Sequence, residues 1–200
     1  MKRVVCCLLT VICVITFITA LPSYAKEPIV NYQVLFSPEA GVADQLISMI
    51  EKENRSIKVA IYALMHSGIA RALIEAHGRG VDVQVIVDPF SVKNRSLVRK
   101  LESTDLPIYV WSPAEKYKRN KNGKNVKQRP SLMHDKFCVL GDTQVWTGSC
   151  NFTFQASLSN RENVVILESA ELASSFLEEF ERLKREGCVP LKEYLSKLDM

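Results

Sequence analysis

The sequence predicts an α/β fold built on a mixed, mostly buried β-sheet with helices on both faces. Two runs of apolar and β-branched residues, 57–64 and 81–87, are typical of central strands buried on both sides. Apolar residues at helical spacing fill the segment 67–76 between them, and Ser67 is expected to cap that helix. A strand, a helix and a strand within about 30 residues predict two parallel strands joined by a right-handed crossover.

The remaining elements complete one layered domain. Further strands are expected at 29–36, 106–111, 132–140, 144–148 and 163–167. Further helices are expected at 41–53, 91–102 and 170–185, the last of which is amphipathic. The three residues 141–143 separate two of these strands and are expected to form a hairpin turn.

The first 25 residues differ from the rest of the chain. Lys2 and Arg3 precede an uncharged apolar run at 4–21, and small residues follow it. A charged start, an apolar centre and a small-residue end are typical of a secretory signal peptide, with cleavage expected between Ala25 and Lys26. The run is about 18 residues long, which is the lower limit for crossing a bilayer, so an uncleaved membrane anchor is the alternative.

Residues 26–200 are long enough to form one domain with its own core. A cleaved signal would deliver this domain to the periplasm or the medium, and an anchor would hold it at the membrane. The formal net charge is +4, and loss of Lys2 and Arg3 lowers it to +2. A net charge that small excludes neither acidic nor basic partners.

Three cysteines follow the N-terminal segment, an odd number for an oxidising compartment. Cys138 and Cys150 lie on the two sides of the expected hairpin, where residue 138 should face residue 147. The two thiols would then be out of register, so no disulfide is expected between them. Cys138 is expected to be a core residue, and Cys188 to be free or to link two chains.

Seven basic residues and almost no apolar ones occupy the stretch 116–129, which is expected to be a mobile loop. The basic residues are Lys116, Lys118, Arg119, Lys121, Lys124, Lys127 and Arg129. Such a loop can contact nucleic-acid phosphates without reading sequence, and Tyr117 and Trp111 are candidates for stacking on bases. The alternative is a solvated surface loop with no binding role.

The segment most informative about chemistry follows this basic stretch. His134 and Lys136 are two apart on an expected strand, so both side chains should point to one face and Asp135 to the other. Ser149 and Asn151 follow the next strand at its end, which a hairpin would bring beside His134. An imidazole, an ammonium, a hydroxyl and an amide would then converge. That set suits a phosphate group, with donors for its oxygens and a nitrogen nucleophile for its phosphorus.

The run HDKFCVLGDTQVWTGSCNFT, residues 134–153, resembles the His-x-Lys and Gly-Ser-x-Asn motif (HKD motif) of the phospholipase D superfamily. The strand SIKVAIYAL, the unit GIARALIEAHGRGVDVQVIVD and the strand NRENVVIL are similar to the small single-motif bacterial endonucleases of that superfamily. The resemblance extends over most of residues 26–200 and implies the phospholipase D/nuclease-like fold for them.

The resemblance also implies a role for each motif residue. His134 would attack phosphorus and form a phosphohistidine, while Lys136 and Asn151 would hold the phosphate oxygens. Ser149 and Glu162 would hydrogen-bond the imidazole and orient it. A carboxylate on one ring nitrogen leaves the other nitrogen free to attack.

One position departs from the superfamily motif, which usually has Asp seven residues after the histidine. That position is Gly141 here, and Asp142 follows it directly. In the superfamily this Asp chiefly makes structural hydrogen bonds, so Asp142 is a candidate supporting residue. The alternative is that Gly141 marks a site that has lost activity.

The superfamily mechanism needs two histidines, one as nucleophile and one as general acid. Neither His66 nor His77 has a lysine two residues on, so this chain carries half a site. Resemblance to the single-motif members implies a homodimer in which the two copies of His134 meet at a two-fold axis. No cofactor is implied, and because residues 26–200 show no other cluster at metal-ligand spacing, metal-independent activity is expected.

These observations predict an exported phosphodiesterase, a non-specific endonuclease that hydrolyses DNA or RNA. One rival keeps the chemistry and changes the substrate to a cardiolipin-like phospholipid, which the membrane-anchor alternative would favour. A second rival is a non-catalytic nucleic-acid-binding protein in which Gly141 marks a site that has lost its activity.

Overall fold

The computed structural model describes residues 30–93, 96–114, 117–128 and 131–198, and its centre is one eight-stranded sheet of order β1-β9-β8-β7-β2-β3-β4-β10. The strands are β1 (Asn31–Phe36), β2 (Ser56–Ile61), β3 (Asp82–Val87), β4 (Ile108–Trp111), β7 (Lys136–Leu140), β8 (Gln144–Gly148), β9 (Asn163–Glu168) and β10 (Cys188–Pro190). β2, β3 and β4 are parallel, and the other neighbours are antiparallel. The predicted mixed sheet is confirmed, while the predicted N-terminal signal segment lies outside the described residues.

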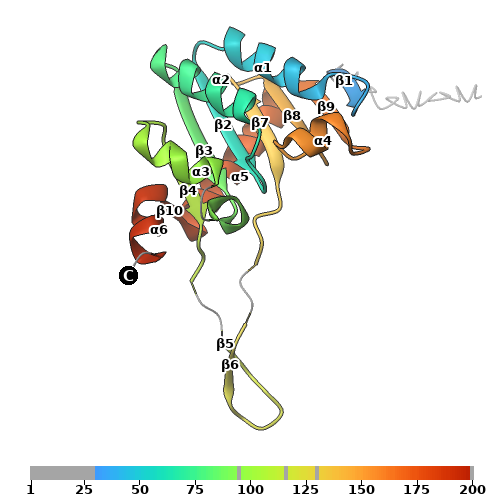
Figure 1. Cartoon of the computed structure of the whole chain (residues 1–200). Coiled ribbons are helices and arrows are strands. Elements are labelled where there is room, and N and C mark those ends of the chain that lie inside the picture. Colours follow the sequence, from blue (N-terminus) through green and yellow to red (C-terminus); the bar gives the residue numbers. More distant parts are fainter. Residues whose placement is uncertain (1–29, 94–95, 115–116, 129–130, 199–200) are drawn as a thin grey trace, which may run out of the picture.

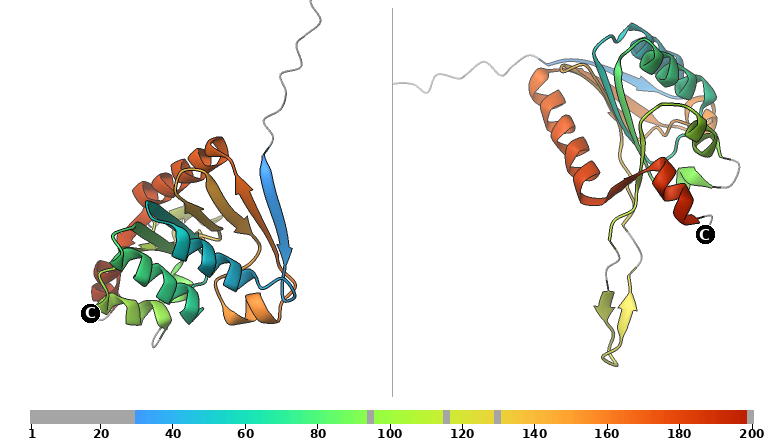
Figure 2. Two further views of the ribbon diagram at one scale, coloured as in Figure 1. Left: turned by 90° about the horizontal axis from the view of Figure 1, so that it is seen from above. Right: turned by 90° about the vertical axis from the view of Figure 1, so that its left-hand side faces the viewer.

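Helices cover both faces of this sheet. The helical segments are α1 (Val42–Lys52), α2 (Ser67–Gly78), η1 (Pro89–Val92), α3 (Leu97–Lys100), η2 (Leu101–Ser103), α4 (Phe154–Leu158), α5 (Ala170–Gly187) and α6 (Leu191–Leu198). Figure 1 and Figure 2 show α1 and α2 on one face and α5 on the other, and each face has its own buried apolar cluster. Within the described parts of the chain, no helix is both long and apolar enough to cross a bilayer.

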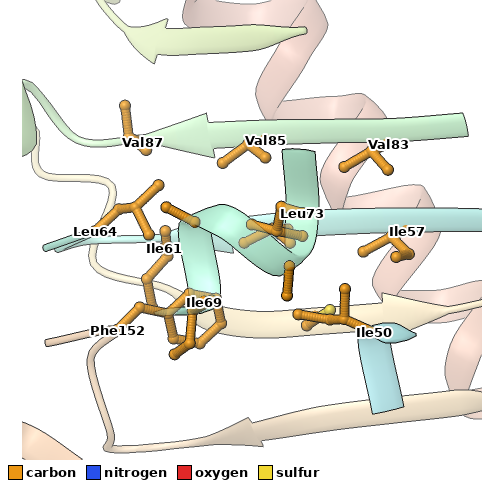
Figure 3. Packing of buried hydrophobic residues seen from close by; sticks show 14 of the residues in the cluster. Ile50, Ile57, Ile61, Leu64, Ile69, Leu73, Val83, Val85, Val87 and Phe152 are labelled. Atoms are coloured by element: carbon orange, nitrogen blue, oxygen red, sulfur yellow. The ribbon is translucent and has the colours of Figure 1, made fainter. Parts of the chain in front are cut away.

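The predicted strand–helix–strand unit lies at the centre of the larger cluster. β2 and β3 pair in parallel, with Ile57 opposite Val83. Leu73 of α2 and Ile50 of α1 pack against these strands and are fully buried (Figure 3). Burial of each such side chain stabilises the fold by about 1.5–3 kcal/mol, so this cluster anchors the strands whose ends carry the candidate site.

The helix predicted at 91–102 is broken into three short segments, so that prediction is wrong. Asp88 caps the first of them, because its Oδ1 accepts a hydrogen bond from Phe90 N at 2.8 Å. Ser96 starts a new turn, because its Oγ accepts from Arg99 N at 3.2 Å. Asp and Ser side chains compete for backbone N–H groups in this way, which ends or restarts a helix despite apolar periodicity.

The basic stretch forms a hairpin instead of the predicted irregular loop. β5 (Tyr117–Arg119) pairs with β6 (Asn125–Lys127) in a separate two-stranded sheet. Asn120 Oδ1 accepts hydrogen bonds from Asn122 N and Lys124 N, and Gly123 takes the positive φ of 73° that closes the turn. Residues 117–128 are called the arm below. Asn-Gly is a strong hairpin signal, so the sequence did contain the information that the prediction missed.

The β7–β8 hairpin differs from the predicted one in register and length. Leu140 pairs with Gln144, which places Cys138 opposite Trp146 and not opposite residue 147. β7 begins at Lys136, four residues later than predicted. Three cysteines of the described chain, Cys138, Cys150 and Cys188, are free thiols. At the C-terminus, β10 and α6 extend the fold beyond the last predicted helix, with β10 antiparallel to β4.

Candidate active site

One end of the sheet collects all five predicted catalytic residues. The end of β2, the start of β7, the end of β8 and the start of β9 lie together there, because neighbours among these strands alternate in direction. His134 precedes β7, and Lys136 begins it opposite Ile61. Ser149 and Asn151 follow β8, and Glu162 precedes β9. The convergence that the sequence predicted is therefore present in the tertiary structure.

The His134 ring is close to both an ammonium and an aromatic ring. Lys136 Nζ is 3.3 Å from His134 Nδ1 and 3.5 Å from His134 Nε2, and it donates to His134 O at 2.8 Å. The Tyr62 ring lies 4.6 Å from the imidazole, centroid to centroid, with a tilt of 54°. Tyr62 is in turn stacked on Phe90 at 5.0 Å. The imidazole of this single chain is thus positioned by Lys136 and by an aromatic stack that the sequence analysis did not identify.

Burial gives Lys136 unusual electrostatics. The residue is 8% exposed, and this burial is the main reason why the pKa of its ammonium is lowered from the ordinary value. The carboxylates of Asp135 and Glu162 oppose the shift. A cation held partly out of water interacts more strongly with an incoming anion, since the effective dielectric constant is lower than in bulk solvent. Lys136 is therefore well placed to hold a phosphate oxygen.

Ser149 and Glu162 form a hydrogen-bonded pair with each other, whereas each was expected to hydrogen-bond the imidazole of His134. Ser149 Oγ donates to Glu162 Oε2 at 2.5 Å and accepts from Asn163 N at 3.1 Å. Asn160 Nδ2 donates to the other carboxylate oxygen at 3.1 Å. In the described residues of this chain, no hydrogen bond joins His134 to either partner. The predicted orienting roles of Ser149 and Glu162 stay predictions.

Asn151 carries a buried polar atom with an open hydrogen-bonding position. Its Oδ1 is buried and has no partner among the described residues. A 180° turn of the amide would exchange Oδ1 and Nδ2, so the same position can present an N–H donor to a phosphate oxygen. An unsatisfied amide at this end of the sheet fits a residue that completes its hydrogen bonds with a ligand.

Two buried polar residues hold the chain around the site, and the sequence analysis gave neither a role. Asp88, at the end of β3, accepts from Met133 N at 3.0 Å through Oδ2, which ties the residue before His134 to the sheet. Ser91 Oγ donates to Tyr62 O and accepts from Leu64 N, both at 3.0 Å. The Asp88-Pro89 step after a buried strand was the available signal, because polar residues at strand ends often carry such links.

Asp135 brings a carboxyl group to a hollow that His134 also lines. Asp135 and His134 both line this hollow, which has a volume of about 600 Å3 and lies beside α5, together with Glu179 and Arg182. The predicted separation of Asp135 from His134 is therefore not observed, because both residues precede the start of β7 at Lys136. Burial raises the pKa of Asp135, and the charge of Glu179 raises it further. The carboxyl groups of Asp135 and Glu179 therefore share a hollow with the imidazole of His134 and the guanidinium of Arg182.

The remaining two histidines both belong to α2 or its N-cap. His66 caps α2, where Ser67 was predicted to do so, and its Nδ1 accepts from Ile69 N at 3.3 Å. Its ring stacks on Phe154 at 4.0 Å, and burial lowers its pKa. His77 lies in the last turn of α2. Among the described residues, neither histidine is hydrogen-bonded to His134.

Gly141 and Asp142 lie at the opposite end of the sheet from His134, in the β7–β8 turn. Gly141 has φ of 62°, a conformation that L residues rarely adopt. Asp142 Oδ2 accepts from Arg55 Nη1 at 3.0 Å, and Arg55 holds the pKa of that carboxyl below its ordinary value. The exchange of Asp and Gly therefore fits the backbone of the turn, and Asp142 supports the fold without contacting the site.

The predicted nucleic-acid-binding residues are separated from the catalytic set. Five of them, Lys118, Arg119, Lys121, Lys124 and Lys127, are exposed on the arm. Lys116 and Arg129 lie outside the described residues. Tyr117 is 59% exposed, whereas Trp111 is 9% exposed and donates from Nε1 to Ser131 O, so it is not available to stack on a base. Within the described segments, no group of three potential ligands is arranged to hold a metal ion.

The fold and the site define a class of protein: an α/β domain that presents an imidazole, a partly buried ammonium and an amide at one end of a mixed sheet. Residues 46–184 match the family described as "Cardiolipin synthase, PLD-like domain". Because this match covers more than half of the chain, the chain belongs to the PLD-like domain family.

Individual relatives extend the comparison. "Phospholipase D" from Rickettsia conorii is 32% identical over 143 residues, which are 72% of this chain and 64% of the relative. "Mitochondrial cardiolipin hydrolase" from Xenopus tropicalis is 30% identical over 143 residues, 71% of this chain and 60% of the relative. The crystal structure of Nuc, a phospholipase D family member from Salmonella typhimurium, has a TM-score of 0.65 and 27% identity, and the alignment covers 80% of this chain and 97% of Nuc. The chain spans less than two thirds of the two curated relatives.

Proposed function

We propose that this protein is a phosphodiesterase that cleaves nucleic acid through a covalent intermediate on His134. The observation that carries the proposal is the contact between the His134 imidazole and the partly buried Lys136 ammonium. A ring nitrogen of His134 attacks phosphorus, the N–P bond forms, and the P–O bond to the leaving group breaks. Lys136 and Asn151 bind the phosphate oxygens, and water then hydrolyses the phosphohistidine.

The proposed reaction needs a general acid for the leaving oxygen, and we assign it to His134 of a second copy of the chain. His66 is a less suitable general acid, because its Nδ1 caps α2 and its ring stacks on Phe154. A two-fold axis at the site would bring both imidazoles to one phosphate. The positive charge of Lys136 from each copy would neutralise the phosphate, so the proposed mechanism requires no metal.

Export is part of the proposal and rests on residues 1–25. Their charged start, apolar centre and small-residue end support a cleaved signal peptide and a periplasmic or secreted domain. Mass spectrometry of the protein recovered outside the cytoplasm tests this directly. A mass that begins at Lys26 supports it, and a full-length mass in the membrane fraction supports the anchor.

A phospholipid diester is the second candidate substrate. One relative is named for cardiolipin hydrolysis, and the site end of the sheet exposes apolar side chains, among them Phe154 at 47% and Leu158 at 64%. Exposed apolar residues near a phosphodiesterase site suit contact with acyl chains as well as contact between two copies.

The test compares substrates in excess EDTA. Purified protein and a His134→Ala variant are incubated with plasmid DNA, single-stranded RNA and cardiolipin vesicles. Cleavage of nucleic acid by the unaltered protein alone supports the proposal. Cleavage of cardiolipin without cleavage of nucleic acid would show that the substrate is the phospholipid. Binding of DNA with no cleavage of any substrate would favour the non-catalytic rival, and loss of cleavage in EDTA would contradict the metal-free mechanism.

A further inference from the structure

We infer that the arm grips polynucleotide phosphates away from the scissile bond, so that the protein acts on long nucleic acids in preference to small diesters. The inference rests on the proposed function for the chemistry at His134. It concerns a different region of the chain, however, so the inference about the arm can be wrong even if the reaction at His134 is right.

Charge is the first argument. The twelve residues of the arm include five cations and no acidic residue. All five, Lys118, Arg119, Lys121, Lys124 and Lys127, are exposed. A dense and one-signed set of cations is the electrostatic signature of a surface that binds a polyanion.

Shape is the second argument. Directly opposite residues of an antiparallel pair point to the same face, so Arg119 and Lys127 lie on one face of the ribbon and Lys118 lies on the other. Lys121 and Lys124 lie in the turn that Asn120 holds together. Cations on both faces and at the tip can meet phosphates on either side. A two-stranded ribbon is also narrow enough for the major groove of DNA, which is about 12 Å wide.

Position is the third argument. The arm is inserted between β4 and β7, and β7 begins two residues after His134. Both connections of the arm therefore leave from the end of the sheet that carries the site. Figure 1 and the right-hand view of Figure 2 show the arm projecting away from the body there. A ligand must be a polymer to touch the arm and His134 at once, because a single diester cannot bridge the two.

The composition of the arm favours nucleic acid over an anionic membrane. Membrane-binding segments bury an apolar face in the lipid. The apolar side chains of the arm, Tyr117 and Val126, lie in its strands, and the turn from Asn120 to Lys124 has none. A polar and cationic tip binds phosphates but has nothing to insert between acyl chains.

The test uses two variants of equal charge. The arm variant carries glutamine at positions 118, 119, 121, 124 and 127, with Asn120 and Gly123 retained for the turn. The control variant carries glutamine in place of five exposed cations on the body, Lys52, Arg71, Arg185, Lys192 and Lys197. Binding of a fluorescent 30-base-pair DNA duplex is measured against salt concentration in a His134→Ala background. Hydrolysis of bis(p-nitrophenyl) phosphate is measured with His134 intact.

Each phosphate contact contributes about 0.9 to the slope of log affinity against log salt concentration. The arm variant should therefore lose about 2 to 4 from the magnitude of that slope, and about tenfold or more in affinity near physiological salt. Its hydrolysis of bis(p-nitrophenyl) phosphate should stay within about twofold of the unaltered protein, and the control variant should bind DNA nearly normally.

Equal losses in the two variants, or unchanged DNA binding by the arm variant, would overturn the inference. So would loss of binding to anionic vesicles by the arm variant without loss of DNA binding, which would assign the arm to a membrane. Failure of the unaltered protein to hydrolyse the small diester would count against the proposed function, and the DNA-binding comparison would still decide the role of the arm.

Discussion

The site end of the sheet and the arm both present cations to a phosphate, but they hold them in opposite ways. At the site, Lys136 is 8% exposed and lies within 3.5 Å of the imidazole, and the surrounding strands belong to the main sheet. On the arm, three exposed cations lie on two strands of three residues each, and two more lie in the turn between these strands. Catalysis needs one group at a defined place, which requires burial, whereas polyanion binding needs charge density, which a small ribbon can supply.

This contrast has an energetic consequence. Burial disfavours the charged form of Lys136, so the fold must hold it with hydrogen bonds such as the one to His134 O. Cations on the arm stay in contact with water and need no such support. Substitutions at the site should therefore change chemistry or stability sharply, and single substitutions on the arm should change binding gradually.

The largest effect is expected from His134→Ala. Removal of the nucleophile should reduce kcat on DNA and on bis(p-nitrophenyl) phosphate by roughly 10^4-fold or more. His77→Ala is the matched control, since His77 lies in the last turn of α2 and should be replaceable without loss. Steady-state rates with both substrates check the prediction. Activity retained by His134→Ala would contradict the proposed covalent mechanism.

The next effect is expected from Asp88→Ala. The Asp88 carboxylate accepts hydrogen bonds from Met133 N and Phe90 N. Its removal leaves both N–H groups without an acceptor. The free energy of unfolding should fall by about 2–4 kcal/mol, and kcat should fall by about tenfold because the segment before His134 is released. Urea titration and rates measured under folding conditions check both parts. Asp105→Ala, at an exposed position, serves as control.

A smaller stability change without a change in kcat would show that the Met133 link does not position His134. That outcome would separate the stability of this end of the sheet from its catalytic geometry.

The pH dependence of the reaction tests the burial of Lys136. Since burial lowers its pKa, the ammonium should lose its proton below the ordinary value of 10.5, and kcat/KM should fall on the alkaline side before that pH. Lys136→Arg keeps its charge, so its profile should lack this alkaline limb even though its rate is lower. An alkaline limb that persists in the Arg variant would assign the titration to another group.

The same shift has a defined sign for stability. Between the lowered pKa of the folded chain and the ordinary pKa of the unfolded chain, the unfolded chain binds more protons at Lys136. The contribution of this group to the free energy of unfolding therefore rises with pH across that window. At neutral pH the buried ammonium lowers the free energy of unfolding. This unfavourable contribution disappears at a pH high enough for Lys136 to be neutral in both the folded and the unfolded chain.

The smallest effect is expected from restoring the superfamily order in the β7–β8 turn with Gly141→Asp and Asp142→Gly. A Cβ at position 141 would lie 2.9 Å from Arg55 Nη2 and would take a positive φ, so about 1 kcal/mol of stability should be lost. Because the turn lies at the far end of the sheet, kcat should stay within about twofold. A large gain in kcat would support the rival in which Gly141 marks a site that has lost activity.

Local patterns in the sequence were sufficient for the central elements. The apolar runs of β2 and β3 and the amphipathic spacing of α5 predicted those elements, because burial of one or both faces of an element determines the periodicity of its apolar residues. The same holds for His134 and Lys136, whose spacing of two placed them on one face of the chain. The arm was also readable in principle, since Asn122-Gly123 is a turn signal, but its charge was taken to indicate an irregular loop.

By itself, then, the sequence determined which residues can carry the chemistry and where along the chain they lie. The tertiary structure decided which of them touch: Tyr62 and Lys136 against the imidazole, Ser149 against Glu162, and Asp88 under Met133. The contact of the Lys136 ammonium with the Tyr62 ring, for example, joins residues that are 74 positions apart in the sequence. Periodicity describes only neighbours within a few residues, so contacts across strands are set by sheet order and register, which emerge when the whole chain packs.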